Sequence, residues 1–160
     1  MNLKIAVLGI GRMGAPMAQR LCAAGYTVQV WNRSPDKAQA LTAHGATAHA
    51  QVQDAVREAD LVISLLESGP IVAHVLFELG AAAAMQPGSL MIDMASIKPA
   101  EARDHAARLN ALGVAHLDAP VSGGTVAAEA GTLAIMVGGE ASDLARALPV
   151  LQHLGKATHV

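Results

Sequence analysis

Aromatic and charged residues are both scarce in this sequence. Across 160 residues, aromatic side chains account for 2% and charged side chains for 15%, whereas hydrophobic residues account for 52%. So little charge predicts apolar surface that meets a partner or a further domain, because monomeric domains rarely expose large apolar patches. The net charge of −2 gives no reason to expect nucleic acid or an anionic membrane as a partner.

Cysteine and long apolar runs are also nearly absent. The one cysteine, Cys22, excludes an internal disulfide and is typical of a reducing cytosol, so we expect a cytoplasmic protein. Its place in a helical pattern favours a structural thiol over a reactive one. No apolar run approaches the ~20 residues of a membrane span, and glycines together with Arg12 interrupt the N-terminal run that could be mistaken for a signal peptide.

The chain instead shows a regular alternation of short apolar runs, rich in β-branched residues, with longer helical patterns. Strands are expected at residues 3–9, 27–31, 46–48, 60–66, 88–95, 114–121, 132–139 and 156–160. Helices are expected at residues 12–24, 34–44, 51–59, 70–84, 99–113 and 142–154. This alternation predicts the doubly wound α/β class, a mostly parallel Rossmann-type sheet with helices on both faces. The length fits one such domain over residues 1–160.

A glycine motif follows the first expected strand and opens the first expected helix. In "GIGRMG", Gly9 would permit a tight turn, Gly11 would let the backbone approach a pyrophosphate, and Gly14 would let the helix pack close to the strand. The helix N-terminus would then face the phosphates. The alternative is a glycine turn that binds nothing. The residues expected to bind a dinucleotide here are Gly9, Ile10, Gly11, Arg12, Met13 and Gly14.

The residues after the second expected strand indicate which dinucleotide is bound. An acid about 20 residues beyond the glycines usually accepts hydrogen bonds from the adenosine ribose, and it would repel a 2′-phosphate. Asn32 and Arg33 stand there instead, followed by Ser34 and Lys37. Two cations and a hydroxyl suit a phosphate, so we expect NADP(H) as the cofactor. The alternative is a solvated loop in which Ser34 only caps the next helix.

Two further loops follow strands and should border the same cofactor, because ligands of open α/β sheets lie beyond the carboxyl ends of the strands. The first loop contributes Leu65, Leu66 and Glu67 as candidate contacts. In the second, Ser96 could bond to the nicotinamide-side ribose, although a turn or cap before the helix at Pro99 is an alternative role.

A third loop, "SGG", predicts a site for a small carboxylate substrate. Ser122, Gly123 and Gly124 place a hydroxyl beside several unobstructed backbone N–H groups, and such a nest can hold a carboxylate. Taken alone, the same residues also suit a flexible turn, with Asp118 as a turn-forming residue. The seven histidines show no metal-binding spacing such as HExxH, so we expect no metal.

Five segments together resemble the β-hydroxyacid dehydrogenases, which include 3-hydroxyisobutyrate dehydrogenase and tartronate semialdehyde reductase. They are "GIGRMGAPMAQRL", "WNRS", "DMASIKP", "DAPVSGG" and "AGTLAIMVGG", in the family's order and spacing. The resemblance covers essentially the whole chain, as the family's N-terminal half. It implies that the loop of Ser122, Gly123 and Gly124 holds the substrate carboxylate. It also implies that Leu66, Glu67 and Ser96 meet the cofactor, and that Asn-Arg marks NADP users.

The sequence departs from this family in two places. The family usually has proline where Glu67 stands, which puts the local cofactor contact in doubt. The family's catalytic lysine lies on a long helix of an all-helical domain, which we expect beyond Val160 and which would make the full-length form a homo-oligomer. The four lysines of this chain, Lys4, Lys37, Lys98 and Lys156, do not match that motif.

Two classes of function follow from these observations. The first is the NADP-binding half of an oxidoreductase acting on a small 3-hydroxyacid or its semialdehyde, inactive by itself. The second is a stand-alone NADP-binding sensor or scaffold, which has no need of a carboxylate nest. Imine reductases share the glycine loop and Asn-Arg but lack the SGG loop, whereas 6-phosphogluconate dehydrogenases share SGG without the preceding "DAP".

Overall fold

Six parallel strands form the main sheet of this protein, for which a computed structural model describes residues 3–160. Their order across the sheet is β3-β2-β1-β4-β5-β6, so the chain moves outward from β1 in one direction and then in the other. The strands are β1 (Lys4–Leu8), β2 (Thr27–Trp31), β3 (Thr47–Ala48), β4 (Leu61–Ser64), β5 (Leu90–Asp93) and β6 (Ala115–Asp118). This order confirms the Rossmann-type doubly wound fold.

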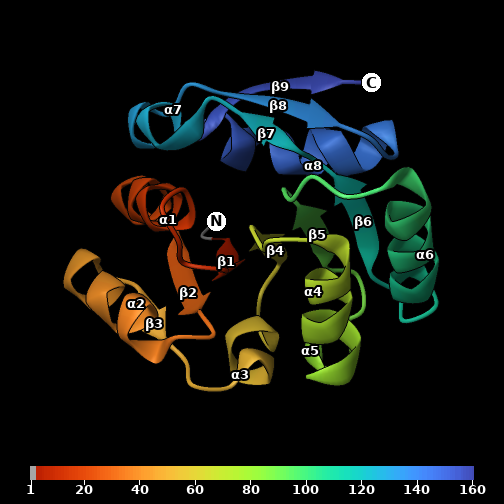
Figure 1. Ribbon diagram of the computed structural model, residues 1–160, viewed down its shortest axis with the longest axis horizontal. Helices are drawn as coiled ribbons and strands as arrows, with labels where there is room; N and C mark the ends of the chain where they lie inside the picture. The colour runs from red at the N-terminus through yellow and green to blue at the C-terminus, as the bar shows by residue number, and fades with distance from the viewer. Residues whose placement is uncertain (1–2) are drawn as a thin grey trace.

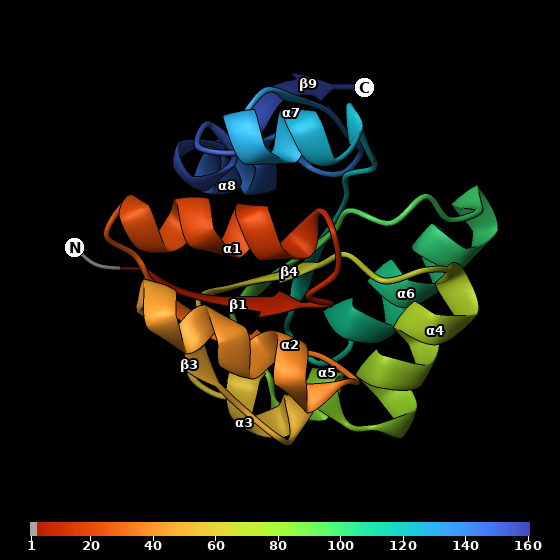
Figure 2. The ribbon, with the colours of Figure 1, turned by 60° about the vertical axis from the view of Figure 1, so that its left-hand side comes forward.

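Helices cover both faces of this sheet, as Figures 1 and 2 show. One face packs against α1 (Gly14–Ala23), α2 (Pro35–Gln39), η1 (Ala40–His44) and α8 (Ala141–Leu151), whereas α7 (Gly124–Ala130) packs on the outer side of α1. The other packs against α3 (Val52–Val56), α4 (Gly69–Ala73), the π-helical segment η2 (His74–Glu78), α5 (Ala81–Ala84) and α6 (Pro99–Asn110). Two separate apolar clusters result, and the central strands are buried on both sides. Within residues 3–160 no helix is both long and apolar enough to cross a membrane.

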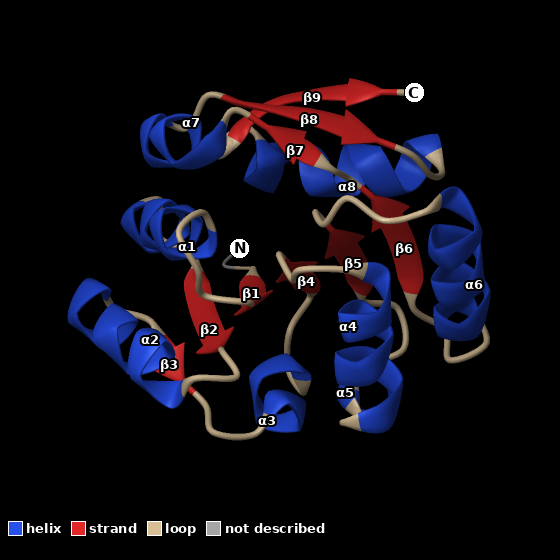
Figure 3. Cartoon of the chain, viewed as in Figure 1, coloured by secondary structure: helices blue, strands red, loops and turns tan. Residues whose placement is uncertain are grey.

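A second, three-stranded sheet was not expected from the sequence. It contains β7 (Val121–Ser122), antiparallel to β8 (Leu133–Val137), and β9 (Gly155–His159), parallel to β8. Figure 3 shows it beyond α1 and α8, away from the main sheet. The single strand expected at residues 114–121 is therefore wrong, because the chain leaves the main sheet between β6 and β7. Pro120 lies at this break and has no N–H to donate to a strand ladder.

Two helical expectations also differ from the structure. The helix expected at residues 70–84 is three segments, with a π-helical turn in the middle and a break at Gly80, whose φ of 89° is left-handed. Residues 124–130 form α7, where the glycines and small residues gave no helical pattern.

Candidate functional site

A cleft of about 640 Å³ opens where the chain switches from β1 to β4, beyond the carboxyl ends of β1, β2 and β4. Ligands of doubly wound sheets bind at this switch point. Ten of the residues proposed from the sequence line the cleft. They are Gly9, Ile10, Gly11, Asn32, Arg33, Ser34, Lys37, Leu65, Leu66 and Glu67.

The three glycines of the first loop meet three different surroundings. Gly9 has a φ of 95°, and a Cβ there would overlap the carbonyl oxygen of Leu65. A Cβ at Gly14 would overlap the carbonyl oxygen of Gly9, so the start of α1 lies directly against the end of β1. A Cβ at Gly11 would meet no atom within 4 Å. The space beside the Gly11 backbone is therefore open to the cleft, which fits a pyrophosphate lying against it.

Asn32 connects the two loops that frame the cleft. Its side-chain Oδ1 accepts a hydrogen bond of 2.8 Å from the Ile10 backbone N–H, and its Nδ2 donates one of 3.1 Å to the Ser34 carbonyl. This role is not visible in the sequence, where Asn32 stands out only because it removes the charge of the usual acid. An acid here could not donate to the Ser34 carbonyl when ionised, so the amide suits this geometry.

Three polar residues after β2 remain available at the mouth of the cleft. Arg33, Ser34 and Lys37 are exposed and line it. Ser34 stands at the N-cap position of α2, but its hydroxyl makes no capping hydrogen bond, contrary to the alternative role considered for it. The guanidinium, the hydroxyl and the ammonium thus lie together where the adenosine ribose of a dinucleotide would be expected.

The opposite wall of the cleft contains residues that the sequence analysis did not propose. Pro70, Ile71, His74, Val75 and Leu79 line it, from α4, η2 and the turn that follows. A π-helical turn is frequent at functional sites and is not visible in an apolar pattern. This wall is largely apolar, as in most small-molecule sites, and Glu67 supplies the acidic side chain of the cleft.

The remaining proposed residues lie outside the cleft lining. Arg12 and Met13 follow Gly11 in the glycine loop, and Ser96 is exposed in the loop after β5. The Ser122–Gly123–Gly124 loop lies between β7 and α7, with φ values of 132° at Gly123 and 67° at Gly124. Both values belong to the left-handed region that glycine tolerates best, so a side chain at either position would be strained. Direct roles of these residues in binding stay predictions.

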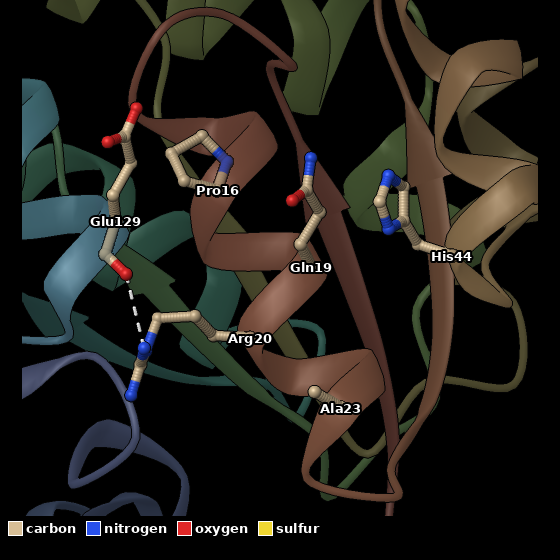
Figure 4. A pocket seen from close by; sticks show the side chains of 6 residues that line it. All are labelled: Pro16, Gln19, Arg20, Ala23, His44 and Glu129. Carbon is tan, nitrogen blue, oxygen red and sulfur yellow. Dashed lines mark hydrogen bonds between the residues drawn. The ribbon is translucent and has the colours of Figure 1, made fainter.

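Arg20 fixes the helix that follows this loop. From α1 its Nε donates to the His153 carbonyl at 2.7 Å, and its Nη1 donates to the Glu129 carbonyl at 3.1 Å. Figure 4 shows the second contact in a small hollow of about 290 Å³ on the outer side of α1. The Arg20 guanidinium also lies against Gly131, where a Cβ would come within 2.5–2.6 Å of it. Arg20 therefore joins α1 to the end of α7 and to the turn before β9.

Replacing Arg20 with methionine is expected to lower the free energy of unfolding by about 1.5–3 kcal/mol, the usual contribution of hydrogen bonds to a charged group. Urea denaturation followed by circular dichroism measures this change. Arg103→Met, at an exposed position of α6, is the control and should change stability by less than about 0.5 kcal/mol. Equal effects of the two substitutions would show that the contacts of Arg20 do not stabilise the fold.

A row of polar side chains, Ser64 and Asp93 buried and Asp118 partly buried, crosses the carboxyl ends of β4, β5 and β6. Ser64 pairs in register with Asp93, and Asp93 pairs with Asp118. The Oδ1 of Asp93 accepts hydrogen bonds from the Ser64 hydroxyl at 3.2 Å and from the Ala95 N–H at 3.0 Å. Asp93 is completely buried, and burial raises its pKa to about 6, with Asp118 adding a smaller electrostatic contribution. Burial also raises the pKa of Asp118.

A second pair of polar side chains, His105 and His116, lies on α6 and β6. Burial lowers the pKa of His116 on β6 to about 4 and also lowers that of His105 on α6. Neither this pair nor the acidic row was proposed from the sequence. The signal available was limited to an aspartate at the end of each of two apolar strands, "LMID" and "AHLD".

Known proteins resemble this chain in both sequence and fold. Residues 4–160 match the family described as the NAD binding domain of 6-phosphogluconate dehydrogenase. A probable 3-hydroxyisobutyrate dehydrogenase of Mycobacterium tuberculosis is 44% identical over 156 residues, which cover 97% of this chain and 52% of the relative. An NAD-dependent L-serine dehydrogenase of Pseudomonas aeruginosa is 43% identical, over 96% of this chain and 52% of the relative.

A solved structure of Mycobacterium tuberculosis 3-hydroxyisobutyrate dehydrogenase with L-serine superimposes with a TM-score of 0.95 at 42% identity. The match covers 99% of this chain and 54% of that one, so the chain spans about half the length of the relatives it matches. Fold, family match and motifs agree. The chain belongs to the family described as the NAD binding domain of 6-phosphogluconate dehydrogenase, and its relatives include proteins named as 3-hydroxyisobutyrate dehydrogenases.

Proposed function

We propose that this chain is the NADP(H)-binding half of an oxidoreductase that moves a hydride between the nicotinamide and a small 3-hydroxyacid or its semialdehyde. The observation that carries the cofactor assignment is the cluster of Arg33, Ser34 and Lys37 at the mouth of the cleft. No acid lines the cleft on this side among residues 3–160, and the forked guanidinium matches a phosphate. The relatives named as hydroxyacid dehydrogenases support the substrate class.

Each part of the cleft would have a distinct task. Gly11 leaves room for the pyrophosphate, and Asn32 holds the glycine loop against the loop after β2. Leu65, Leu66 and the apolar wall exclude water from one side of the dinucleotide. The bound cofactor supplies the hydride chemistry. Glu67 places a carboxylate in the same cleft, and it would weaken the binding of any phosphate near it.

The Ser122–Gly123–Gly124 loop is the proposed site for the substrate carboxylate. Its backbone is fixed by left-handed glycines and by the start of α7, which Arg20 anchors at the other end. Three exposed residues in this conformation present a hydroxyl and backbone N–H groups to a small anion. The proton donor for the carbonyl oxygen would come from a residue outside this chain, as the family resemblance implies.

The cofactor assignment predicts that the chain binds NADPH at least about tenfold more tightly than NADH. A charged hydrogen bond to the 2′-phosphate contributes about 1.5–3 kcal/mol, and 1.4 kcal/mol corresponds to a factor of ten in affinity. Trp31 lines the cleft and provides an intrinsic fluorescence signal for titrating each dinucleotide.

Arg33→Ala should remove most of this preference while leaving the affinity for NADH within about twofold. Arg103→Ala removes a cation of α6 away from the cleft lining and is the matched control. Equal affinities of the unsubstituted protein for both dinucleotides would overturn the NADP(H) assignment. A preference that survives in Arg33→Ala would assign phosphate recognition to other residues.

A further inference from the structure

Two buried carboxyl oxygens of the acidic row have no partner. Within residues 3–160, neither the Oδ2 of Asp93 nor the Oδ1 of Asp118 has a hydrogen-bond partner, although each atom is inaccessible to solvent. Native proteins satisfy nearly all buried polar atoms, because a buried oxygen without a donor costs about 1–3 kcal/mol. Two such oxygens on neighbouring residues therefore need a physical explanation.

The register of the sheet brings the two carboxyl groups together. Asp93 and Asp118 are directly paired on parallel strands β5 and β6, so their side chains lie on the same face. Adjacent strands are about 4.8 Å apart, which is within reach of two aspartate side chains. The opposite oxygen of Asp93 is already engaged by Ser64 and Ala95, which leaves its Oδ2 as the atom without a donor.

We propose that Asp93 and Asp118 share one proton, donated from one carboxyl group to the free oxygen of the other, and that this pair positions the loops of the cofactor cleft. One proton would satisfy both oxygens, because a protonated carboxyl donates and an ionised one accepts. The raised pKa of both groups is consistent with a pair that retains a proton on folding. This inference concerns the same site as the proposed function, and its role in cofactor binding rests on that proposal.

The pair lies where three functional loops leave the sheet. Ser64, held by Asp93, directly precedes Leu65 and Leu66 of the cleft. Ala95, also held by Asp93, directly precedes Ser96. The Ala119 N–H donates to the Asp93 carbonyl at 2.7 Å at the start of the segment leading to Ser122. Loss of the proton would leave two like charges side by side at this junction and would push the three loops apart.

Among residues 3–160, few other titratable groups lie near the Asp93–Asp118 pair. The two histidines among them make the stability depend on pH in the opposite direction. His116 is two residues before Asp118 on β6, and His105 on α6 is close enough to His116 to affect its charge. Glu101 lies in the first turn of α6, where it accepts from the Lys98 N–H. The lowered pKa of the two histidines makes the folded protein lose stability as the pH falls. The raised pKa of Asp93 gives a contribution that is complete below about pH 4 and is lost as the pH rises through 6.

The experiment compares unfolding in urea at pH 4 to 8, without cofactor, for the unsubstituted protein and for Asp93→Asn, Asp118→Asn and the double variant. The pKa of Asp93 rises from 3.8 to about 6 on folding. The unfolding constant of the unsubstituted protein should therefore increase about a hundredfold from pH 4 to pH 7, relative to that of Asp93→Asn. If the proton is shared, Asp118→Asn should reduce the same change, and the effect of the double variant should be smaller than the sum of the two single effects.

If Asp93 and Asp118 titrate independently, the unfolding measurements should give a different result. Asp118→Asn would then leave the contribution of Asp93 intact, and the effects of the two substitutions would add, which would overturn the shared proton. Glu140→Gln, at an exposed side chain, is the control and should leave the profile unchanged. Should Asp93→Asn fail to fold, Asp118→Asn decides the question alone, since Asp118 is only partly buried and its loss must still lower the pKa of Asp93.

The effect on the loops is tested with NADPH. The affinity of the unsubstituted protein for NADPH, divided by that of Asp93→Asn, should fall about tenfold from pH 5.5 to pH 8. Asp93→Ala should bind NADPH weakly at both pH values. The comparison cancels the titration of the cofactor's own phosphate, which is common to both proteins. A constant ratio would overturn the positioning role. Failure of every variant to bind NADPH would instead refute the proposed function, while the unfolding data still decide whether the proton is shared.

Discussion

Gly11→Val is expected to lower NADPH affinity at least a hundredfold while the protein remains folded. A Cβ at residue 11 would meet no atom within 4 Å, so we expect the fold to tolerate a side chain there. The same space is where the pyrophosphate would lie against the backbone, and a branched side chain would occupy it. Fluorescence titration of Trp31 measures the loss of binding, and circular dichroism with urea unfolding establishes that the variant is folded.

Gly14→Val is the contrasting substitution in the same loop. Its Cβ would overlap the carbonyl oxygen of Gly9, and backbone cannot move as a flexible side chain does. Stability should therefore fall by about 1–3 kcal/mol or more, because the contact between α1 and β1 would have to open. A folded Gly11→Val protein with ordinary NADPH affinity would show that the loop is structural and would remove the basis of the cofactor assignment.

The sequence was sufficient to predict the fold class and to choose residues that line one cleft, because both depend on local patterns. Apolar strands alternate with helical patterns, and the glycine motif stands at the one junction where strand, turn and helix must pack closely. Gly9 and Gly14 meet each other in the structure as this spacing requires. Arg33 and Lys37 follow β2, and the topology then brings them to the mouth of the cleft.

What the sequence could not show depends on contacts between distant segments. Pro120 was visible, but only the pairing of β7 with β8 reveals that the chain leaves the main sheet there. The aspartates at positions 93 and 118 are 25 residues apart in the chain, and only the register of β5 with β6 places them side by side. Asn32 was interpreted through the acid it replaces, whereas its hydrogen bond to Ile10 spans 22 residues.

This chain is expected to bind NADPH yet to show no measurable turnover of tartronate semialdehyde or methylmalonate semialdehyde. General acid–base catalysis typically contributes about 10²- to 10⁴-fold, and positioning of the substrate contributes more. Three of the four lysines are poorly placed for proton transfer to a substrate. Lys4 lies at the start of β1, on the opposite edge of the sheet from the cleft, and pairs with Glu58. Lys37 lines the expected phosphate corner, and Lys156 lies on β9 of the second sheet.

An NADPH oxidation assay tests this expectation with the chain alone and with a fusion of the chain to the second half of the Mycobacterium tuberculosis relative. Because the matched part covers 52% of that relative, the fusion supplies the half that the match leaves out. Activity in the fusion alone would support a proton donor from the second half. Robust activity of the chain alone would contradict it. Lys98 would then be the first residue to replace, because it is exposed in the loop after β5, at the carboxyl edge of the sheet where ligands of this fold bind. Lys98→Met should abolish such activity, and Arg103→Met should not.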